Sequence, residues 1–572
     1  MRAIRELRPA YDGRVTDERS SRLQEGRAAL AAYQWALALA AFDDVLATSE
    51  DPDARFSRGI AAWWLDDVQA AMRDWERAYV AYRRAGAFEP AVISAVYLAL
   101  SASMSLGNQA TARGWTARAE RLVRDHDLEA VRGWVGFCQA HFATEDGHPE
   151  AARRHATEAL DAARAAGTLD ADLELCLVAE VGMALVELGH VDEGVRFLDE
   201  AMAGAMSGEA RDPDSVVLIA CRSISGSTRS GDVRRATEWI RQSDAYHERH
   251  GSMHLYATCR LEYGILLFAT GGWERAEREL ERARQARGAV EPALQAAAAA
   301  TLAELRVAQG RLDEATRLVA GLDDFAAAVP AIALVRLRRG EPSPAASLLR
   351  RRLREIEDGT LHASGLQELL AEAEVAGGHP DAARSLGDRL LEIGEGTGNA
   401  AILARAHRTL GRAQLEIGGE AGAIEHIDLA VAGFARLGLP YDAARSRALL
   451  ARAAAAVDPP LAVAEARTAL VAFDDLGAPR DADAMAALLR ELGVRASPRG
   501  PRAAGTLTHR EQEVLTLLGE GLSNREIGDR LFITRKTLEH HVASVLGKLG
   551  LGGRSEAAAF AVRRQAEDRA AK

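Results

Sequence analysis

A short basic stretch near the C-terminus, Arg535-Lys536-Thr537, has residue types that bind phosphate groups. Thr534 precedes it and is a good N-cap residue, so a helix is expected to begin here and to continue to about Leu549. The first turn of a helix offers free backbone N–H groups and the positive end of the helix dipole, and both attract phosphate oxygens. We therefore predict that these residues contact a nucleic-acid backbone instead of being ordinary solvated charges.

The same helix has two different faces. Its apolar residues recur at helical spacing and are expected to be buried: Leu538, Val542, Val545 and Leu549. The opposite face has small residues at 543 and 547, which allow close approach to a DNA major groove. On this helix Glu539 would either accept a hydrogen bond from a cytosine amino group or pair with Arg535. His540 and Ser544 would each contact a base or a phosphate.

A second capping box, Ser523-Asn524-Arg525-Glu526, begins a shorter helix before the turn. A short helix, a tight turn and a long capped helix are typical of a helix-turn-helix. Asn524 and Arg525 would contact the DNA backbone on the other side, and Lys548 and Arg554 would hold phosphates at the far end. The predicted DNA-binding residues are Asn524, Arg525, Arg535, Lys536, Thr537, Glu539, His540, Ser544, Lys548 and Arg554.

Three separated blocks of this region resemble the LuxR-type DNA-binding domain. They are LTHREQEVL at 507–515, EGLSNREIG at 520–528 and FITRKTLEHH at 532–541. The resemblance implies a bacterial transcription regulator whose four-helix domain binds a twofold-related DNA site as a dimer. It also implies that the fourth helix supplies the dimer contact, through Ala557, Ala558, Ala561 and Val562.

A repeat of the form G-x4-A runs through the rest of the chain. It begins clearly at Gly107 with Ala112, recurs about every 39 residues up to Gly418, and has Gly194 in the alanine place of one copy. The register extends upstream to Asp66 and Tyr33, and downstream to Asp458 with Val463. Each unit is predicted to be two helices joined by a turn, because glycine permits a positive φ and the small residue permits close helix approach.

These repeats resemble tetratricopeptide repeats, and their long period is similar to the superhelical domain of MalT-type regulators. The predicted fold class is therefore all-α: an α-solenoid of about twelve tetratricopeptide-like hairpins followed by a four-helix LuxR-type helix-turn-helix domain. Five segments are expected: an N-terminal arm at 1–19, a sensor or interaction solenoid at 20–492, a Pro- and Gly-rich flexible linker at 493–506, the DNA-binding domain at 507–565 and a tail at 566–572.

Composition and charge agree with this division. The chain has 572 residues, of which 48% are hydrophobic and 5% aromatic, and its net charge is −12. Residues 501–572 carry 12 Lys and Arg against 9 Asp and Glu, so a basic end follows an acidic body. No long apolar run and no secretory signal are visible, so we expect a cytoplasmic protein without a membrane partner. Four cysteines without a CxxC pair suit a reducing compartment.

Enzymatic and cofactor chemistry is not expected. No catalytic triad order or paired-carboxylate context stands out, and no cofactor is predicted. The best candidate metal ligands are His247, His250 and His254, but Gly251-Ser252 between the last two indicates a turn, so no metal is predicted. The chain contains no G-x-x-x-x-G-K-[ST] motif, so we expect no ATP-binding module of the kind that larger LuxR-type regulators carry.

Two functions are compatible with these features. The first is a transcription regulator that binds double-stranded promoter DNA as a homodimer, under control of a protein or small-molecule effector in the solenoid groove. The alternative is a tetratricopeptide scaffold or adaptor, whose terminal helix-turn-helix binds DNA weakly or binds protein. A regulator would prefer particular DNA about 10³-fold or more over random DNA, whereas an adaptor would show no such preference.

Overall fold

The computed structural model describes residues 17–251, 253–285, 292–494, 509–519 and 522–531, and further positions between 538 and 561. The chain divides into two compact units, Met1–Met485 and Ala486–Lys572. In the part that is described, every regular element is a helix. The predicted all-α fold class is confirmed.

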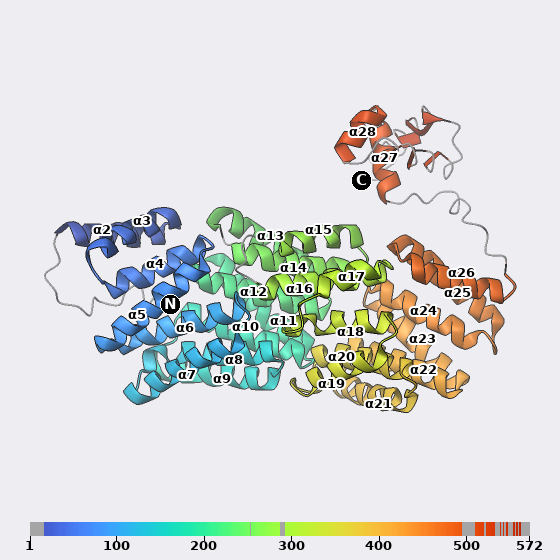
Figure 1. The fold of residues 1–572 in the computed structure, drawn as a ribbon, viewed down its shortest axis with the longest axis horizontal. Coiled ribbons are helices and arrows are strands. Elements are labelled where there is room, and N and C mark those ends of the chain that lie inside the picture. Colours follow the sequence, from blue (N-terminus) through green and yellow to red (C-terminus); the bar gives the residue numbers. More distant parts are fainter. Residues whose placement is uncertain are drawn as a thin grey trace. The chain divides into compact units, whose positions relative to one another are not determined.

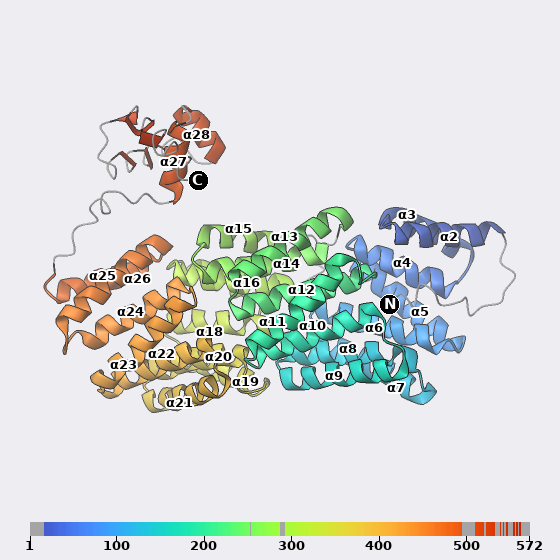
Figure 2. The same ribbon diagram turned by 180° about the vertical axis from the view of Figure 1, so that it is seen from behind.

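Successive helices of the first unit pack in pairs (Figures 1 and 2). The first six pairs are α2 (Asp17–Ala31) with α3 (Trp35–Thr48), α4 (Pro52–Trp64) with α5 (Val68–Arg84), α6 (Phe88–Met104) with α7 (Gln109–His126), α8 (Glu129–Asp146) with α9 (Pro149–Ala166), α10 (Ala171–Glu187) with α11 (Val191–Ser207), and α12 (Pro213–Ser230) with α13 (Val233–His250).

The next six pairs are α14 (Met253–Ala269) with α15 (Trp273–Arg284), α16 (Pro292–Ala308) with α17 (Leu312–Val319), α18 (Val329–Arg338) with α19 (Pro342–Leu353), α20 (Leu361–Ala376) with α21 (Pro380–Thr397), α22 (Ala400–Ile417) with α23 (Glu420–Arg436), and α24 (Pro440–Ala454) with α25 (Pro459–Leu476). A short 3-10 helix, η1 (Ala326–Ala328), precedes α18, and α26 (Pro479–Glu491) ends the series. The predicted α-solenoid of about twelve tetratricopeptide-like hairpins is confirmed.

The predicted repeat glycines lie at the turn inside each hairpin. From Gly107 to Gly418 their φ angles fall between +63° and +89°, the left-handed region in which glycine is favoured. Tyr33 (φ +59°) and Asp66 (φ +67°) adopt the same conformation in the two upstream hairpins, where the sequence has no glycine. The repeat register predicted from the sequence therefore also holds in the two hairpins that lack a turn glycine.

The small residue of the repeat packs between the two helices of its hairpin. Ala112, Ala152 and Ala276 are 0% exposed, as the need for close approach predicts. In the last hairpin the prediction was wrong by one residue, since Ala462 and not Val463 is fully buried. The reason is that Asp458 is the N-cap of α25 and so already lies past the turn position.

Hairpins far apart in the chain also contact each other. The indole Nε1 of Trp35 donates to the His250 carbonyl at 2.9 Å, and that of Trp64 donates to Asp214 at 2.8 Å, over separations of 215 and 150 residues. The Glu357 amide donates to the Gly147 carbonyl at 2.7 Å. Successive windings of the solenoid therefore pack on one another instead of leaving an open spiral.

The aromatic and sulfur-containing side chains of this unit serve packing. Trp35 stacks on Trp64 with ring centroids 4.5 Å apart, and Trp75 is 0% exposed. All four cysteines are free thiols, and three of them are buried. None of the described helices combines the length and apolar character that crossing a membrane requires.

The second unit contains α27 (His509–Gly519) and α28 (Asn524–Leu531), and helical residues also occur within 538–546 and 554–561. These segments share one apolar core. Its buried members are Val514, Leu515, Leu517, Leu518, Ile527, Leu538, Val545, Ala557 and Ala561.

Candidate nucleic-acid interface

The helix predicted to enter DNA is anchored through its apolar face. Leu538 and Val545 are 0% exposed in the core of the second unit, and Val542 is partly buried against it. Leu549 lies outside the described residues. The buried positions recur at helical spacing, so the residues between them belong to the opposite face of the helix.

The preceding helix begins with the predicted capping box. The backbone amide and the hydroxyl of Ser523 both donate to Glu526 Oε2 at 2.7 Å, and the Glu526 amide donates to Ser523 Oγ at 3.3 Å. The hydrogen bonds from Ser523 hold the pKa of the Glu526 carboxyl below its ordinary value. The reciprocal bonds satisfy N–H groups that the first turn of α28 would otherwise leave free.

Two predicted phosphate-binding residues contact each other. Arg554 donates to the Asn524 side-chain oxygen and to the Leu522 carbonyl. The guanidinium thus joins the start of α28 to the last helical segment of the unit, which gives Arg554 a role in holding the domain together. Arg525 lies on α28, and its side chain is outside the part of the chain that the structure describes.

The other predicted contact residues are not among the described residues, and they stay predictions. They are Arg535, Lys536, Thr537, Glu539, His540, Ser544 and Lys548.

The predicted dimer surface requires a correction. Ala557 and Ala561 are 0% and 3% exposed and belong to the domain core, because the fourth segment turns this alanine face toward α27 and α28. Their methyl groups are therefore not available to a second copy. Ala558 is partly exposed, and Val562 lies outside the described residues. A dimer contact on this segment would have to use the face that carries Ala558.

The compact core, the capping box and the order of the described helices agree with a helix-turn-helix domain. Residues 505–561 match the family described as bacterial regulatory proteins, luxR family. The C-terminal module is therefore a LuxR-family helix-turn-helix domain.

Curated relatives match the chain over this region. The "DNA-binding transcriptional activator DevR/DosR" of Mycobacterium tuberculosis (strain ATCC 25618 / H37Rv) is 42% identical over 93 residues, which are 16% of this chain and 42% of that protein. The "Transcriptional regulatory protein LiaR" of Bacillus subtilis (strain 168) is 44% identical over 75 residues, or 13% of this chain and 33% of that protein. The chain thus spans less than half the length of these relatives.

Solved structures with all-helical repeats also match. The APC/C hetero-tetramer Cut9-Hcn1 aligns with 83% of this chain and 96% of its own, at 14% identity and a TM-score of 0.35. A Rap protein complexed with competence and sporulation factor aligns with 56% of this chain and 97% of its own, at 12% identity and a TM-score of 0.36.

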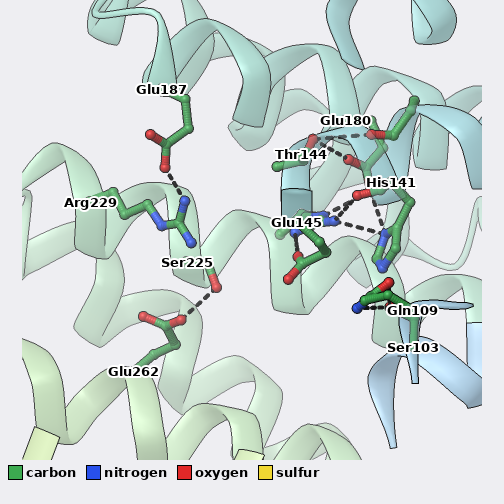
Figure 3. Close-up of polar contacts among 12 residues, drawn as sticks. Ser103, Gln109, His141, Thr144, Glu145, Glu180, Glu187, Ser225, Arg229 and Glu262 are labelled. Atoms are coloured by element: carbon green, nitrogen blue, oxygen red, sulfur yellow. Dashed lines mark hydrogen bonds and ion pairs between the residues drawn. The ribbon is translucent and has the colours of Figure 1, made fainter. Parts of the chain in front are cut away.

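A second candidate site lies in the solenoid, where a network of charged side chains surrounds the buried Glu180 and Arg222 (Figure 3). Arg222 donates to Glu180 at 2.8 Å and to Glu145 at 2.6 Å, and His141 Nδ1 lies 2.8 Å from Glu180. Glu180 is 0% exposed, so its charge depends on these partners. Burial alone would raise the pKa of Glu145, but Arg222 and His141 outweigh it and lower that pKa to about 2.

A cavity of about 260 Å³ adjoins this network. Glu145 and Glu187 from one winding line it, as does Arg229, which is ion-paired with Glu187. His362 from the next winding completes the wall, and burial lowers its pKa to about 4, so its imidazole is neutral at pH 7. The wall therefore offers both hydrogen-bond donors and acceptors to a polar guest.

The sequence singled out none of these interior residues. It singled out His250 as a metal candidate; that ring packs against Tyr33 and Tyr246, with centroids 4.3 and 4.4 Å away. Among the described side chains, no group of three potential metal ligands gathers, and the side chain of His254 lies outside them.

Proposed function

We propose that this protein is a bacterial transcriptional regulator that binds promoter DNA through residues 507–565. The observation that carries the proposal is the match of residues 505–561 to the luxR family, in a module whose core and capping box are formed. The helix that begins near Thr534 enters the major groove, and Arg535, Lys536 and Thr537 hold the adjacent phosphates. His540 and Glu539 lie where base edges would be read.

Binding is proposed to involve two copies on a twofold-related site. The isolated module reads only a short sequence, and pairing two modules doubles the length that is read. The solenoid contributes control: an effector bound in its interior alters how the chains associate, and thereby the effective concentration of the paired modules. The polar cavity between windings supports this part of the proposal, because it can hold a small polar molecule.

The proposal is tested by selecting genomic DNA fragments with the full-length protein, with Lys536→Ala and with Arg467→Ala. Arg467 lies exposed on α25 of the solenoid, so its variant loses the same charge away from the predicted interface. We expect a recurrent, roughly palindromic motif for the native protein and Arg467→Ala, and its loss or strong weakening for Lys536→Ala.

The salt dependence of binding gives a second readout. If Lys536 contacts a phosphate, its removal lowers the slope of log K against log salt by about 1. Equal enrichment and equal slopes for the native protein and Lys536→Ala would remove Lys536 from the interface. Absence of any sequence preference in the native protein, at every condition tried, would favour the scaffold or adaptor function instead.

A further inference from the structure

A second cavity of the solenoid, lined by other residues than the network of Figure 3, is rich in arginine. Its volume is about 490 Å³, within the range of small-molecule sites. Five guanidinium groups border it, and we call it the arginine cavity: Arg338, Arg412, Arg445, Arg452 and Arg480. They come from α18, α22 and α24, which are the first helices of their hairpins, and from α26, which ends the series. Such helices form the inner, concave side of a solenoid.

The charge of this cavity is opposite to that of the chain around it. Only three carboxylates border it, Glu372, Glu416 and Asp481, so the five arginines leave an excess of positive charge. The chain as a whole carries a net charge of −12, and the acidic excess lies in the solenoid. A positive pocket in an acidic body selects for anions, because its walls attract them while the outer surface repels them.

Glu372 is shared by three of the arginines. Its Oε1 accepts from Arg338 at 2.8 Å, and its Oε2 lies 2.9 Å from both Arg412 and Arg445. Each guanidinium carries five N–H donors, and three of these groups share the one Glu372 carboxylate. Burial and the neighbouring Arg445 lower the pKa of Arg412, although Glu372 opposes this shift. An additional anion would therefore relieve the repulsion among these cations.

Arg452 and Arg480 contribute guanidinium groups that face solvent. Both side chains are exposed to solvent and border the cavity, and neither makes an ion pair with the described part of the chain. Two unpaired guanidiniums that flank three crowded ones provide the planar donor groups that bind carboxylate and phosphate.

One wall of the cavity is apolar and aromatic. The Tyr441 ring packs between Trp273 and Phe473, with centroids 5.2 and 6.1 Å away, and its hydroxyl donates to Asp481 at 2.9 Å. Tyr441 and Phe473 both border the cavity, as does Leu449. Inorganic ions would leave this wall unused, whereas a ring or short chain would bury against it.

We propose that the arginine cavity binds a small organic anion, whose carboxylate or phosphate group is held by Arg412, Arg452 and Arg480 and whose apolar part packs on Tyr441 and Phe473. This inference names a binding site and a ligand class, and it does not depend on the function of the second unit. The test contains no DNA, so its result is independent of the proposed function.

The test is calorimetric titration of the full-length protein with phenyl phosphate, benzoate, inorganic phosphate and neutral benzyl alcohol, at constant ionic strength. Phenyl phosphate and benzoate distinguish the two acidic groups, and benzyl alcohol removes the charge but keeps the ring. The variants are Arg452→Ala with Arg480→Ala, and the control is Arg467→Ala, an exposed arginine of α25 that does not border the cavity. All three positions are exposed, so the variants are expected to keep the fold, which circular dichroism checks.

We expect saturable binding of phenyl phosphate, benzoate or both, and weaker binding of inorganic phosphate. The double variant should bind at least about tenfold more weakly, since it loses two charge-assisted interactions, while Arg467→Ala stays within about twofold of the native protein. Equal affinities in all three proteins would overturn the proposal, because the anion would then bind elsewhere. Failure of both aromatic anions to bind, or equally tight binding of benzyl alcohol, would overturn it too.

Discussion

A close backbone-to-backbone helix contact of the solenoid can be tested with a single methyl group. Gly194 of α11 stands where the other repeats have alanine, and it faces Gly182 of α10. A Cβ atom at Gly194 would lie 2.5 Å from the Gly182 carbonyl oxygen and 2.7 Å from the Val186 backbone nitrogen. Both contacts are with backbone atoms, so no side-chain rotation relieves them, and Gly194→Ala must push the two helices apart.

The expected magnitude follows from two opposing effects. Alanine is favoured over glycine inside a helix by about 1 kcal/mol. Overpacking a well-packed contact costs about 1–3 kcal/mol, and a clash with backbone on both sides belongs at the upper end. The net expectation is a local destabilisation of about 2 kcal/mol. Gly114 on α7 is the matched control, because a Cβ there would meet no atom within 4 Å, and Gly114→Ala should gain about 1 kcal/mol.

Hydrogen exchange is the suitable assay, since long repeat arrays do not unfold as one cooperative unit. A cost of about 2 kcal/mol corresponds to roughly 30-fold faster exchange of amides in α10 and α11 that exchange through opening of this hairpin. Gly114→Ala should instead leave α10 and α11 unchanged and slow exchange in α7. If Gly194→Ala slowed exchange or left it unchanged, the argument from close backbone approach would be wrong.

Three further predictions concern buried charge and capping. Arg222→Met should destabilise the hairpins that contain α10 and α12 by about 3–5 kcal/mol, measured as faster hydrogen exchange of their amides, because fully buried Glu180 loses its guanidinium partner. Adding Glu180→Gln should restore part of the loss. Burial raises the pKa of Glu304 to about 7. The contribution of this carboxyl to the free energy of unfolding therefore falls as the pH rises from about 4.5 to 7, because the folded state holds the proton more tightly. Glu304→Gln should raise Tm at pH 8 and have little effect on Tm at pH 4. Ser523→Ala should destabilise the second unit by about 1 kcal/mol in thermal unfolding, because it removes the capping hydrogen bonds at the start of α28.

The hairpins could be predicted because their signal is local and recurs. Each hairpin requires a turn residue with positive φ and a buried small residue five positions later. Both requirements are short-range, and they recur in every repeat. The single error of register, at Asp458, arose where the glycine is absent and an N-cap residue resembles the turn residue before it. The fourth segment of the second unit failed for another reason. Alanine is compatible with a core and with an interface, so residue type alone could not tell the face of Ala557 from that of Ala558.

The interior charges carried a periodic signal of their own. Glu145, Glu187 and Arg229 each lie two residues before a turn glycine, and Arg338 and Glu416 lie at the same register near the arginine cavity. That position falls in the last turn of the first helix of its hairpin, and these five residues border one cavity or the other. Charged residues that recur at one register of otherwise apolar helices indicate a polar inner surface.

Contacts between windings could not be predicted in this way, because each of them occurs only once in the described part of the chain. Trp35 donates to a backbone carbonyl, Trp64 donates to a carboxylate, and Gly147 accepts from an amide, so the partners share no residue type and no spacing. The periodic sequence pattern records the contacts between neighbouring hairpins, because those contacts recur in every repeat. The contacts between windings do not recur, so they leave no periodic pattern. These single contacts nevertheless determine the interior. They bring the ends of α8 and α10 against the start of α20, and so they enclose the polar cavity that the hairpins alone would leave open.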